Sequence, residues 1–513
     1  MKIEDFQQEF AALPGAAPVW HGTLDPGRLR PLCQDVRSAG GRLVALWGSQ
    51  GGGPSFALHV AVAVQQGLAV ASLPLEREAP AFPDISDIFP AAGRMQRAVA
   101  DLLGFQAAHA ADRRPWLRHG HWPADRFPLS KEFDGTRAFP PEGDTYPFVA
   151  VEGEGVHEIP VGPVHAGTIE PGHFRFSVVG EKVLRLEQRL GYTHKGIEKL
   201  FEAMTVEQGA RLAGRISGDS TVAYAWAYAM AAEGVSGSTP PPRALWLRAL
   251  FLERERIMNH LGDLGALGND AGLAFALAQF SRLKEDVLRT NQALFGHRYL
   301  MDAIVPGGVA HDVDFRGFSR IIEEITELER EVPRLKRIFE DHAGLQDRFL
   351  TTGRVKPDLA ARLGLAGLAG RASGQSWDLR AQFPCAPYDG LEVRMATHRG
   401  GDVAARVTVR FEELTESMRL CRILLRKMPE GETSTPLNPM QPAGLGIGWV
   451  EGWRGEVLLA LHTGEDGALR RVHPHDPSWH NWPVLEHAVI GNIVPDFPLI
   501  NKSFNLSYSG HDL

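Results

Sequence analysis

Cysteine is scarce in this sequence, and its three cysteines do not cluster. The 513 residues contain only Cys33, Cys385 and Cys421, which lie far apart and form no Cys-x-x-Cys pair. A disulfide framework needs paired cysteines and a four-cysteine iron–sulfur or zinc site needs four, so this chain can assemble neither. We expect all three to be buried structural thiols.

The sequence also lacks a basic excess, an export signal and an apolar run of membrane length. Its 62 acidic and 54 basic side chains give a net charge of -8, which offers no footprint for nucleic acid or anionic lipid. The start, MKIEDFQQEF, is acidic where a secretory leader is basic. The most apolar window, 56–75, contains His59 and the polar step QQG, which predicts two strands and a turn. We expect a cytoplasmic chain without a transmembrane segment.

The hydrophobic pattern divides the chain into two units. Residues 1–130 predict a small α/β domain, and residues 158–513 predict a mainly helical domain with small sheets, so the expected fold class is α+β. Residues 131–157, rich in Pro, Gly and aromatic residues without a period, predict a linker. The expected elements of the first unit are an N-terminal helix, a strand at 42–48, the strand pair at 56–75 and a helix at 91–105.

The second unit shows long helical patterns between shorter strand-like segments. Helical patterns cover 194–233, 242–268, 273–297, 315–343 and 403–428. Pro333 predicts a kink or a break in the fourth of these. The stretch 445–463 alternates apolar and polar residues as a half-buried hairpin does.

The C-terminal segment from 473 is rich in His, Asn, Trp and Pro and poor in Lys and Glu. Termini normally fray, so this composition predicts an end that is buried against the domain. Its histidines match no metal-ligand spacing and are expected to be structural or interface residues. They are His473, His475, His480 and His487.

Long stretches in a fixed order carry a resemblance to a known family. The stretch FPDISDIFPAAGRMQRAVADLLGF resembles the small hydrophilic subunit of respiratory complex I. The quinone-site subunit of complex I, with the related large subunits of membrane-bound energy-converting [NiFe] hydrogenases, is similar to four later stretches: VGPVHAGTIEPGHFRFSVVGEKVLRLEQRLGYTHKGIEKLFE, LERERIMNHLGDLGALGNDAG, NQALFGHRYLMDAIVPGGV and EGWRGEVLLALHTGEDGALRRVHPHDPSWHNWP. Fusion of both units in one chain resembles the large subunit of formate hydrogenlyase-type complexes.

The resemblance implies where a metal site would lie. In the hydrogenases of this superfamily, one Cys-x-x-Cys pair near the start of the large domain and one at its end hold nickel and iron. Here the first pair falls on Ser217 and Ser220, with Tyr224 at the following histidine, and the second falls on Ser507 and Gly510. A serine hydroxyl stays neutral and is a hard, weak ligand, so it does not replace a thiolate.

The row of Ser217, Ser220 and Tyr224, with Asp219 beside it, therefore needs another explanation. These spacings of three and four residues place the row on one face of a helix. A hydrogen-bonded contact that satisfies buried partners is favoured. A small-molecule or water-filled pocket and a metal site without thiolates are the alternatives.

The family's quinone contacts are also altered. In complex I relatives, the loop that begins like GPVHAGTIEPG carries a second histidine four residues after the first. Here His165 is followed at that place by Ile169, and the quinone tyrosine aligns at or beside Gly218. An apolar isoleucine does not supply the proton or hydrogen bond that quinone reduction needs.

Further polar residues are candidates for a cavity wall or a charge relay. Glu253, Arg256 and His260 share a helix face, where an internal ion-pair network is the alternative to a relay. Arg371 and Asp378 lie in a segment that resembles the one flanking the family's central cavity.

Other charged residues suggest contacts with partner subunits. His194 and Lys195 follow a strand and open a helix, where they either face an iron–sulfur subunit or are a solvated helix start. The charges of Glu451, Arg454 and Glu456 predict a strand edge that faces a partner.

Three functional hypotheses follow from the resemblance. The first is a peripheral subunit, on the cytoplasmic side of the cell membrane, that has lost its [NiFe] centre and couples a redox arm to membrane ion-translocating subunits. It binds no cofactor itself, and an iron–sulfur cluster is expected on a partner. The second is an NADH:quinone oxidoreductase-type subunit that binds quinone or another acceptor with non-standard residues. No Gly-x-Gly-x-x-Gly follows a strand, so an NAD site would be on a partner. The third, ranked last, is an active [NiFe] hydrogenase.

Overall fold

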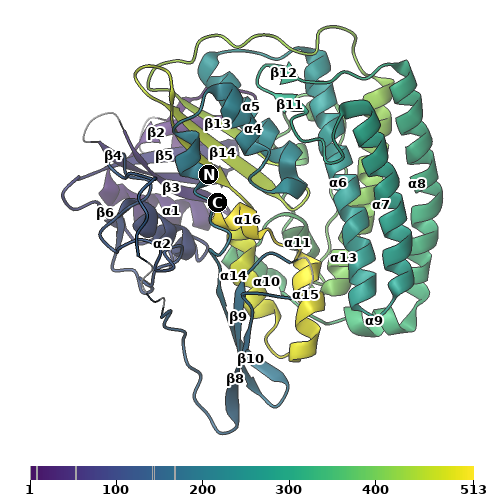
Figure 1. Ribbon diagram of the computed structural model, residues 1–513, viewed down its shortest axis with the longest axis horizontal. Coiled ribbons are helices and arrows are strands. Elements are labelled where there is room, and N and C mark those ends of the chain that lie inside the picture. The colour runs from purple at the N-terminus through teal and green to yellow at the C-terminus, as the bar shows by residue number, and fades with distance from the viewer. Residues whose placement is uncertain (1, 7–9, 52–54, 141–142, 144, 167–168) are drawn as a thin grey trace.

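The computed structural model describes residues 2–6, 10–51, 55–140, 143, 145–166 and 169–513. An N-terminal unit, residues 11–108, packs beside a larger and mainly helical unit, residues 156–513 (Figure 1). Between them, the described residues of 109–155 form no helix or strand. Sheets and helices are both present and are largely separate along the chain, so the expected α+β class is confirmed.

A five-stranded sheet forms the N-terminal unit, with strand order β1-β2-β5-β4-β3. Its strands are β1 (Ala11–Ala12), β2 (Val19–Thr23), β3 (Arg42–Gln50), β4 (Phe56–Val64) and β5 (Gly67–Leu75), and its helices are α1 (Leu29–Ser38) and α2 (Ala92–Leu103). A short parallel pair, β6 (Ala81–Pro83) and β7 (Gln106–Ala108), lies beside it. The predicted pair at 56–75 is the antiparallel hairpin β4–β5, which confirms that prediction. The expected N-terminal helix is wrong for the described residues, where only a 3-10 turn forms at Ile3–Asp5 and α1 follows β2.

The two faces of this sheet pack against different partners. Leu58, Val60 and Val62 of β4 belong to the same buried cluster as α1 and α2. Ala61 and Ala63, which alternate with them, belong to the core of the larger unit. Successive side chains of a strand point to opposite faces, so burial on both faces explains the nearly continuous apolar run.

The larger unit begins with a sheet and continues into helices. Its first sheet, in the order β10-β9-β8, projects from the body of the molecule (Figure 1). Its strands are β8 (Val156–Val161), β9 (His173–Val179) and β10 (Lys182–Arg189), followed by α3 (Ile197–Phe201), α4 (Val206–Ala213), α5 (Thr221–Ser236), α6 (Pro242–Asp270), α7 (Ala274–Phe295), β11 (Ile304–Val305), β12 (Gly308–Val309), α8 (Phe315–Asp341), α9 (Ala343–Phe349), α10 (Pro357–Leu363), α11 (Gly367–Ala372), α12 (Leu379–Gln382) and α13 (Val403–Arg426).

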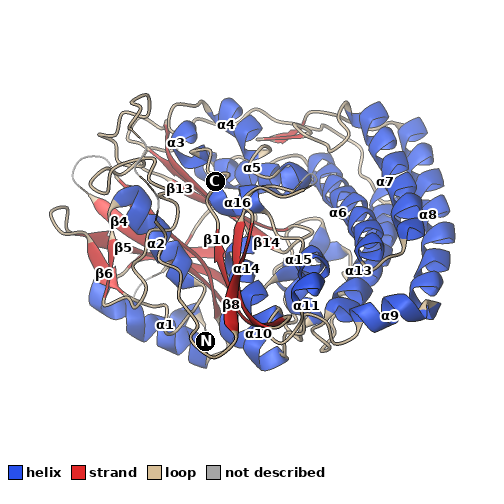
Figure 2. Ribbon diagram, turned by 60° about the horizontal axis from the view of Figure 1, so that its bottom comes forward, coloured by secondary structure: helices blue, strands red, loops and turns tan. Residues whose placement is uncertain are grey.

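The chain ends in a second three-stranded sheet and three helices. These are β13 (Leu445–Glu451), β14 (Glu456–Thr463), β15 (Leu469–His475), α14 (Ser478–Ala488), α15 (Phe497–Phe504) and α16 (Tyr508–Asp512). Figure 2 shows the long helices α6, α7, α8 and α13 gathered at the side of the molecule away from the N-terminal sheet. Leu513 is only 3% exposed, which confirms the predicted burial of the C-terminal segment. No described helix has both the length and the apolar character needed to cross a membrane.

Two helix predictions need correction. The pattern at 194–233 is not one helix, because Thr205 caps a new helix, α4, and a 3-10 turn at Gly218–Ser220 precedes α5. Of the kink or break predicted at Pro333, the break is wrong, because α8 continues through this residue. Pro333 lies on the exposed face of α8, where water can satisfy the carbonyl that loses its hydrogen bond.

The hairpin at 445–463 forms as β13 and β14, but it is not half-buried. Almost every residue of both strands is buried. Helix α5 packs on both strands, and Trp47 of the N-terminal unit donates a hydrogen bond to His462 of β14 (3.2 Å). The hairpin is thus enclosed by elements distant in sequence, which its polar alternation does not reveal.

Candidate functional site

The two serine motifs, 290 positions apart in the chain, meet in space. Ser217 Oγ and Ser507 Oγ lie 2.9 Å apart. Ser217 donates its hydroxyl proton to Asp219 Oδ1 (2.9 Å), so the hydroxyl of Ser507 donates to Ser217. Ser507 also caps α16, because its oxygen accepts from the Gly510 N–H at 2.9 Å. The predicted helical row is wrong, because α5 begins at Thr221: Ser217 and Ser220 both precede the helix, and only Tyr224 lies in it.

A buried guanidinium lies beside these serines. Arg454 donates to Asp219 Oδ1 (2.8 Å), to Ser220 Oγ (3.1 Å) and to the Asn505 carbonyl (2.5 Å). Burial opposes ionisation of Asp219, but the charge of Arg454 outweighs it and the pKa of Asp219 is lowered. Arg454 and Asp219 therefore form an ion pair beside Ser217 and Ser220, two of the positions where the resemblance places metal ligands.

Tyr224 and Gly510, the other positions of the metal-site comparison, also make or adjoin contacts within the chain. Tyr224 donates its hydroxyl to Asp476 Oδ2 at 2.7 Å. A Cβ at Gly510 would lie 2.5 Å from the same carboxylate oxygen, so a cysteine there would displace Asp476. Within the described part of the chain, no group of three or more His, Cys, Asp or Glu side chains could hold a metal ion. Neutral hydroxyls beside a guanidinium do not fit a nickel–iron centre, which requires soft anionic ligands.

A cavity of about 550 Å³ opens next to the serines. Ser217, Asp219 and Ser507 line one part of it, and Asp270 and Lys502 line another. Its apolar wall comes from β8, β9 and the C-terminal helices, through Val161, Phe174, Phe497 and Leu506. This size and mixed lining suit a ligand that has an apolar body and a polar end.

Both residues of the quinone-loop comparison line this cavity, where Nε2 of His165 is already engaged and Ile169 has no polar side-chain group. His165 donates from Nε2 to the Gly172 carbonyl at 2.8 Å, and Ile169 is 54% exposed. Gly218, at or beside which the resemblance places the family's quinone tyrosine, also lines the cavity. The residues between His165 and Ile169 include positions outside the described part of the chain.

The five relay candidates lie in one buried region and are joined by further buried polar residues, of which Ser417 and Glu413 carry no signal in the sequence. Glu253 accepts from Arg380 (3.0 Å), Tyr388 (2.6 Å) and Ser417 (2.6 Å), and Asp378 pairs with Arg380 (2.7 Å). This part of the network joins α6, α12 and α13.

The second part of the network centres on Arg371. It pairs with Glu413 (2.7 Å) and Glu451 (2.7 Å), while His260 contacts Glu413 at 2.9 Å. Arg256 donates to the carbonyls of Glu451 and Gly452 at the end of β13. The expected charged edge facing a partner is wrong, because Glu451 is 4% exposed and is paired inside the chain.

The terminal histidines and the other singled-out residues have mixed environments. His473 contacts Glu198 Oε1 (2.7 Å), and His475 contacts His480 (3.3 Å). His194 donates to the Asp512 carbonyl at 2.8 Å, whereas Lys195 is exposed. Of the three cysteines, Cys33 and Cys421 are buried and Cys385 is half-buried.

Comparisons with known proteins agree on one family. The family model described as "Respiratory-chain NADH dehydrogenase, 49 Kd subunit" matches residues 270–442, and the "30 Kd subunit" model matches residues 23–138. Formate hydrogenlyase subunit 5 of Escherichia coli (strain K12) is 30% identical over 84% of this chain and 77% of its own length. The carbon monoxide-induced hydrogenase of Rhodospirillum rubrum is 32% identical over 68% of this chain and 97% of its own length.

Further relatives support the fused organisation and the fold. The NADH-quinone oxidoreductase C/D protein of Phocaeicola vulgatus (strain ATCC 8482) is 28% identical, with 82% of this chain and 84% of the relative covered. A chain of the membrane-bound sulfane sulfur reductase, an archaeal respiratory membrane complex, has a similar fold, with a TM-score of 0.66 and 24% identity. That match covers 70% of this chain and 99% of the other.

Proposed function

This chain belongs to the family that joins the 30 kDa and 49 kDa subunits of respiratory-chain NADH dehydrogenase and includes formate hydrogenlyase-type relatives, and we propose that it is a peripheral subunit without a nickel–iron centre of its own. It works in a membrane-associated oxidoreductase complex, because its relatives are named as subunits of such complexes. The observation that carries the proposal is the Ser217–Ser507 hydrogen bond beside the Arg454–Asp219 ion pair, at the positions of the metal ligands.

The proposed role is coupling between a redox arm and a membrane arm. One partner is an iron–sulfur subunit, which would contact the surface around His194 and Lys195. The other partners are integral membrane subunits that translocate ions, on whose cytoplasmic side this chain would lie. The buried network around Arg371 and Glu253 joins helices α6, α11, α12 and α13 to strand β13, so it can transmit a rearrangement between the two arms.

Metal analysis of the assembled complex tests the first part of the proposal. The complex is purified from membranes of its native host through a tag on this chain, and nickel and iron are quantified per mole of the chain. We expect nickel well below stoichiometric amounts, with iron present through the partner subunit. One nickel per chain, with an anomalous nickel peak between Ser217 and Ser507, would contradict the proposal.

A vesicle experiment tests coupling. Inverted membrane vesicles receive electrons from a reduced viologen dye, with added ubiquinone as the terminal electron acceptor, and ion uptake is followed. In vesicles from a strain that lacks this chain, we expect dye oxidation by the remaining redox subunits to continue without ion uptake, and the restored chain to return uptake. Equal uptake with and without the chain would contradict a coupling role.

A second candidate function is binding of quinone or another acceptor, and the 550 Å³ cavity favours it. A photoreactive ubiquinone analogue is applied to the purified complex, and labelled peptides are mapped. Labelling within 161–174 or 497–509 that excess ubiquinone suppresses would support acceptor binding. Leu506→Arg, which places a charge in the cavity wall, should abolish this labelling. Labelling that Leu506→Arg leaves unchanged would remove the cavity as the site.

A further inference from the structure

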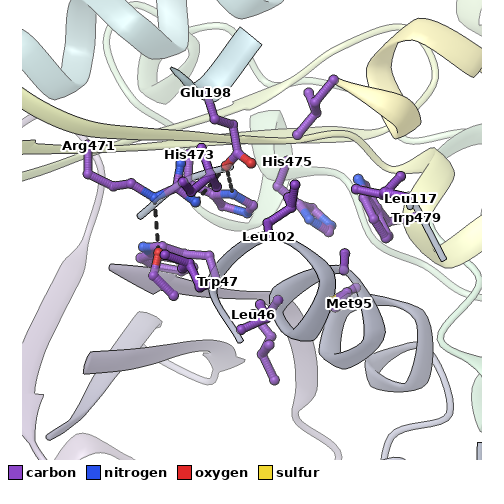
Figure 3. Close-up of a pocket in the computed structure, with 16 residues that line it drawn as sticks. Leu46, Trp47, Met95, Leu102, Leu117, Glu198, Arg471, His473, His475 and Trp479 are labelled. Atoms are coloured by element: carbon purple, nitrogen blue, oxygen red, sulfur yellow. Dashed lines mark hydrogen bonds and ion pairs between the residues drawn. The ribbon is translucent and has the colours of Figure 1, made fainter. Parts of the chain in front are cut away.

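A second, much smaller cavity lies between the N-terminal unit and the larger unit (Figure 3). The volume of this cavity is about 30 Å³. Helix α2 supplies much of its apolar wall through Met95, Ala98, Val99 and Leu102. The larger unit supplies polar residues, from α3, β15 and α14. The cavity thus has an apolar side and a polar side.

The hydrogen bonds of the polar side fix the tautomer of His473. Glu198 pairs with Arg471 at 2.7 Å, and its oxygen also lies 2.7 Å from His473 Nδ1. Burial disfavours the Glu198 charge, but Arg471 and His473 lower the pKa of Glu198 to about 2. An ionised carboxylate only accepts hydrogen bonds, so Nδ1 of His473 carries the proton. Burial lowers the pKa of His473, so the ring is neutral and Nε2 presents a lone pair.

Two polar atoms of the lining have no hydrogen-bond partner in the described structure. These atoms are His473 Nε2, an acceptor, and Trp479 Nε1, a donor. Their residues are 7% and 3% exposed, so bulk water does not satisfy them. Leaving a buried polar group unpaired is unfavourable. A molecule in the cavity would remove this penalty.

The cavity limits the size and charge of such a molecule. A single water needs about 10–15 Å³ of this volume, so the space exceeds one water and admits only a few heavy atoms. The charges of Arg471 and Glu198 balance each other, so a charged ligand would be buried without a counter-ion. We propose that this cavity is a binding site for a small uncharged molecule that donates a hydrogen bond to His473 Nε2. Water and small hydroxyl compounds share this chemistry.

Methanol is a probe that separates the two sources, since its methyl group suits the apolar wall and its hydroxyl suits His473. Crystals of the full chain are compared before and after a methanol soak. We expect water density at His473 Nε2 before the soak and a methanol oxygen there afterwards. If the water at His473 Nε2 remained after the methanol soak, it would be a structural water, and the proposal would be overturned. The absence of any density at His473 Nε2, before and after the soak, would overturn it as well.

A titration in solution provides the second measurement. In protein with 15N-labelled histidine, methanol should shift the Nε2 resonance of His473 in a saturable manner. Ala98→Leu fills the cavity from its apolar side without touching the Glu198–His473 pair, and it should weaken the apparent affinity at least tenfold. Ala100→Leu, on the same helix but outside the lining, is the matched control and should leave the affinity unchanged. If Ala98→Leu and Ala100→Leu showed the same apparent affinity for methanol, the proposal would be overturned.

Discussion

At the scale of single residues, the groups at the metal-ligand positions satisfy one another. Ser217, Ser507 and Asp219 form a continuous chain of hydrogen bonds that ends on the guanidinium of Arg454. A divalent cation placed among these groups would be repelled by Arg454 and would find no anionic sulfur. Restoring a metal site would therefore require more than four cysteines, because Arg454 and Asp476 would also have to move.

Glu255 is a buried carboxyl group without an ion-pair partner among the described residues, and it predicts a dependence of stability on pH. It accepts from the N–H groups of Val222 (2.7 Å) and Ala223 (3.3 Å), so it caps α5 from α6. Burial raises the pKa of Glu255 to about 8, so the folded state holds a proton that the unfolded state releases above about pH 4.5. The contribution of Glu255 to the free energy of unfolding should fall as pH rises from 4.5 to 8, by up to about 1.4 kcal/mol per pH unit.

Glu255→Gln should flatten this dependence and keep the shorter capping bond. Glu255→Ala should cost about 1–3 kcal/mol at pH 7, because it leaves buried N–H groups unpaired. Urea unfolding at pH 5, 6, 7 and 8 measures both effects. An unchanged pH slope in Glu255→Gln would show that Glu255 is ionised in the folded protein.

The buried histidines predict loss of stability in acid. Burial lowers the pKa of His480 from 6.5 to about 4, so the ring stays neutral in the folded protein while the unfolded chain gains a proton. At His480 the unfolded state binds more protons between pH 6.5 and 4, so the contribution of this residue to the free energy of unfolding decreases as pH falls through this window.

His480→Gln should reduce that slope by about 1.4 kcal/mol per pH unit, because it removes one titrating group. The glutamine can still donate to the Leu43 carbonyl, which His480 contacts at 3.2 Å. Urea unfolding at pH 4.5, 5.5 and 6.5 measures the slope, with His157→Gln on the exposed strand β8 as the control. The same slope in wild type and His480→Gln would contradict the prediction.

The sequence predicts which residues depart from the family pattern, but not which residues they contact. The spacing and the family resemblance locate Ser217 and Ser507, since motifs are local in sequence. Arg454 could not be assigned to Asp219, because that pair joins positions 235 apart and exists only when the β13–β14 turn packs against the start of α5. The misassigned edge at Glu451 has the same cause, since burial depends on elements that fold over it.

At the scale of elements, helix α5 packs unusually close to strand β13. Ala223, Ala227 and Ala231 recur every four residues and face glycines of β13 and its turn. A Cβ at Gly448 would lie 1.8 Å from the Ala227 carbonyl oxygen, so only glycine allows this approach.

Gly448→Ala should therefore be strongly destabilising, by at least about 3 kcal/mol, because a backbone contact has to open in a close-packed core. Thermal unfolding and the yield of soluble protein measure the effect. Gly135→Ala, where a Cβ meets nothing within 4 Å, is the matched control. Equal midpoints for the two variants would show that the helix and strand can separate at little cost.

The long helices were predictable because their periodicity is strong over many turns. Helices α6, α7 and α13 begin and end within a few residues of the sequence prediction. The pattern at 194–233 failed because α5 is alanine-rich and buried on all sides, so it has no amphipathic period to mark where it begins.

At the scale of the whole molecule, the two units share a polar and aromatic interface. Arg42 pairs with Glu456, and Arg94 pairs with Glu486 at 2.6 Å. The ring of Trp47 stacks between His59 (5.1 Å) and His473 (5.3 Å). The sequence indicated two units but not this interface, since no local pattern records which faces meet.

The contacts of Trp47 across this interface predict how the two units unfold. It is fully buried, and it contacts the larger unit through both His462 and His473. Trp47→Ala should cost about 3–5 kcal/mol and weaken the interface more than either unit, so calorimetry should show two separated transitions in place of one cooperative transition. Trp20→Ala, at a half-buried position of β2 that contacts the other side of the N-terminal unit, should lower the midpoint less and keep a single transition. A single transition in Trp47→Ala would mean that the remaining ion pairs are sufficient to couple the units.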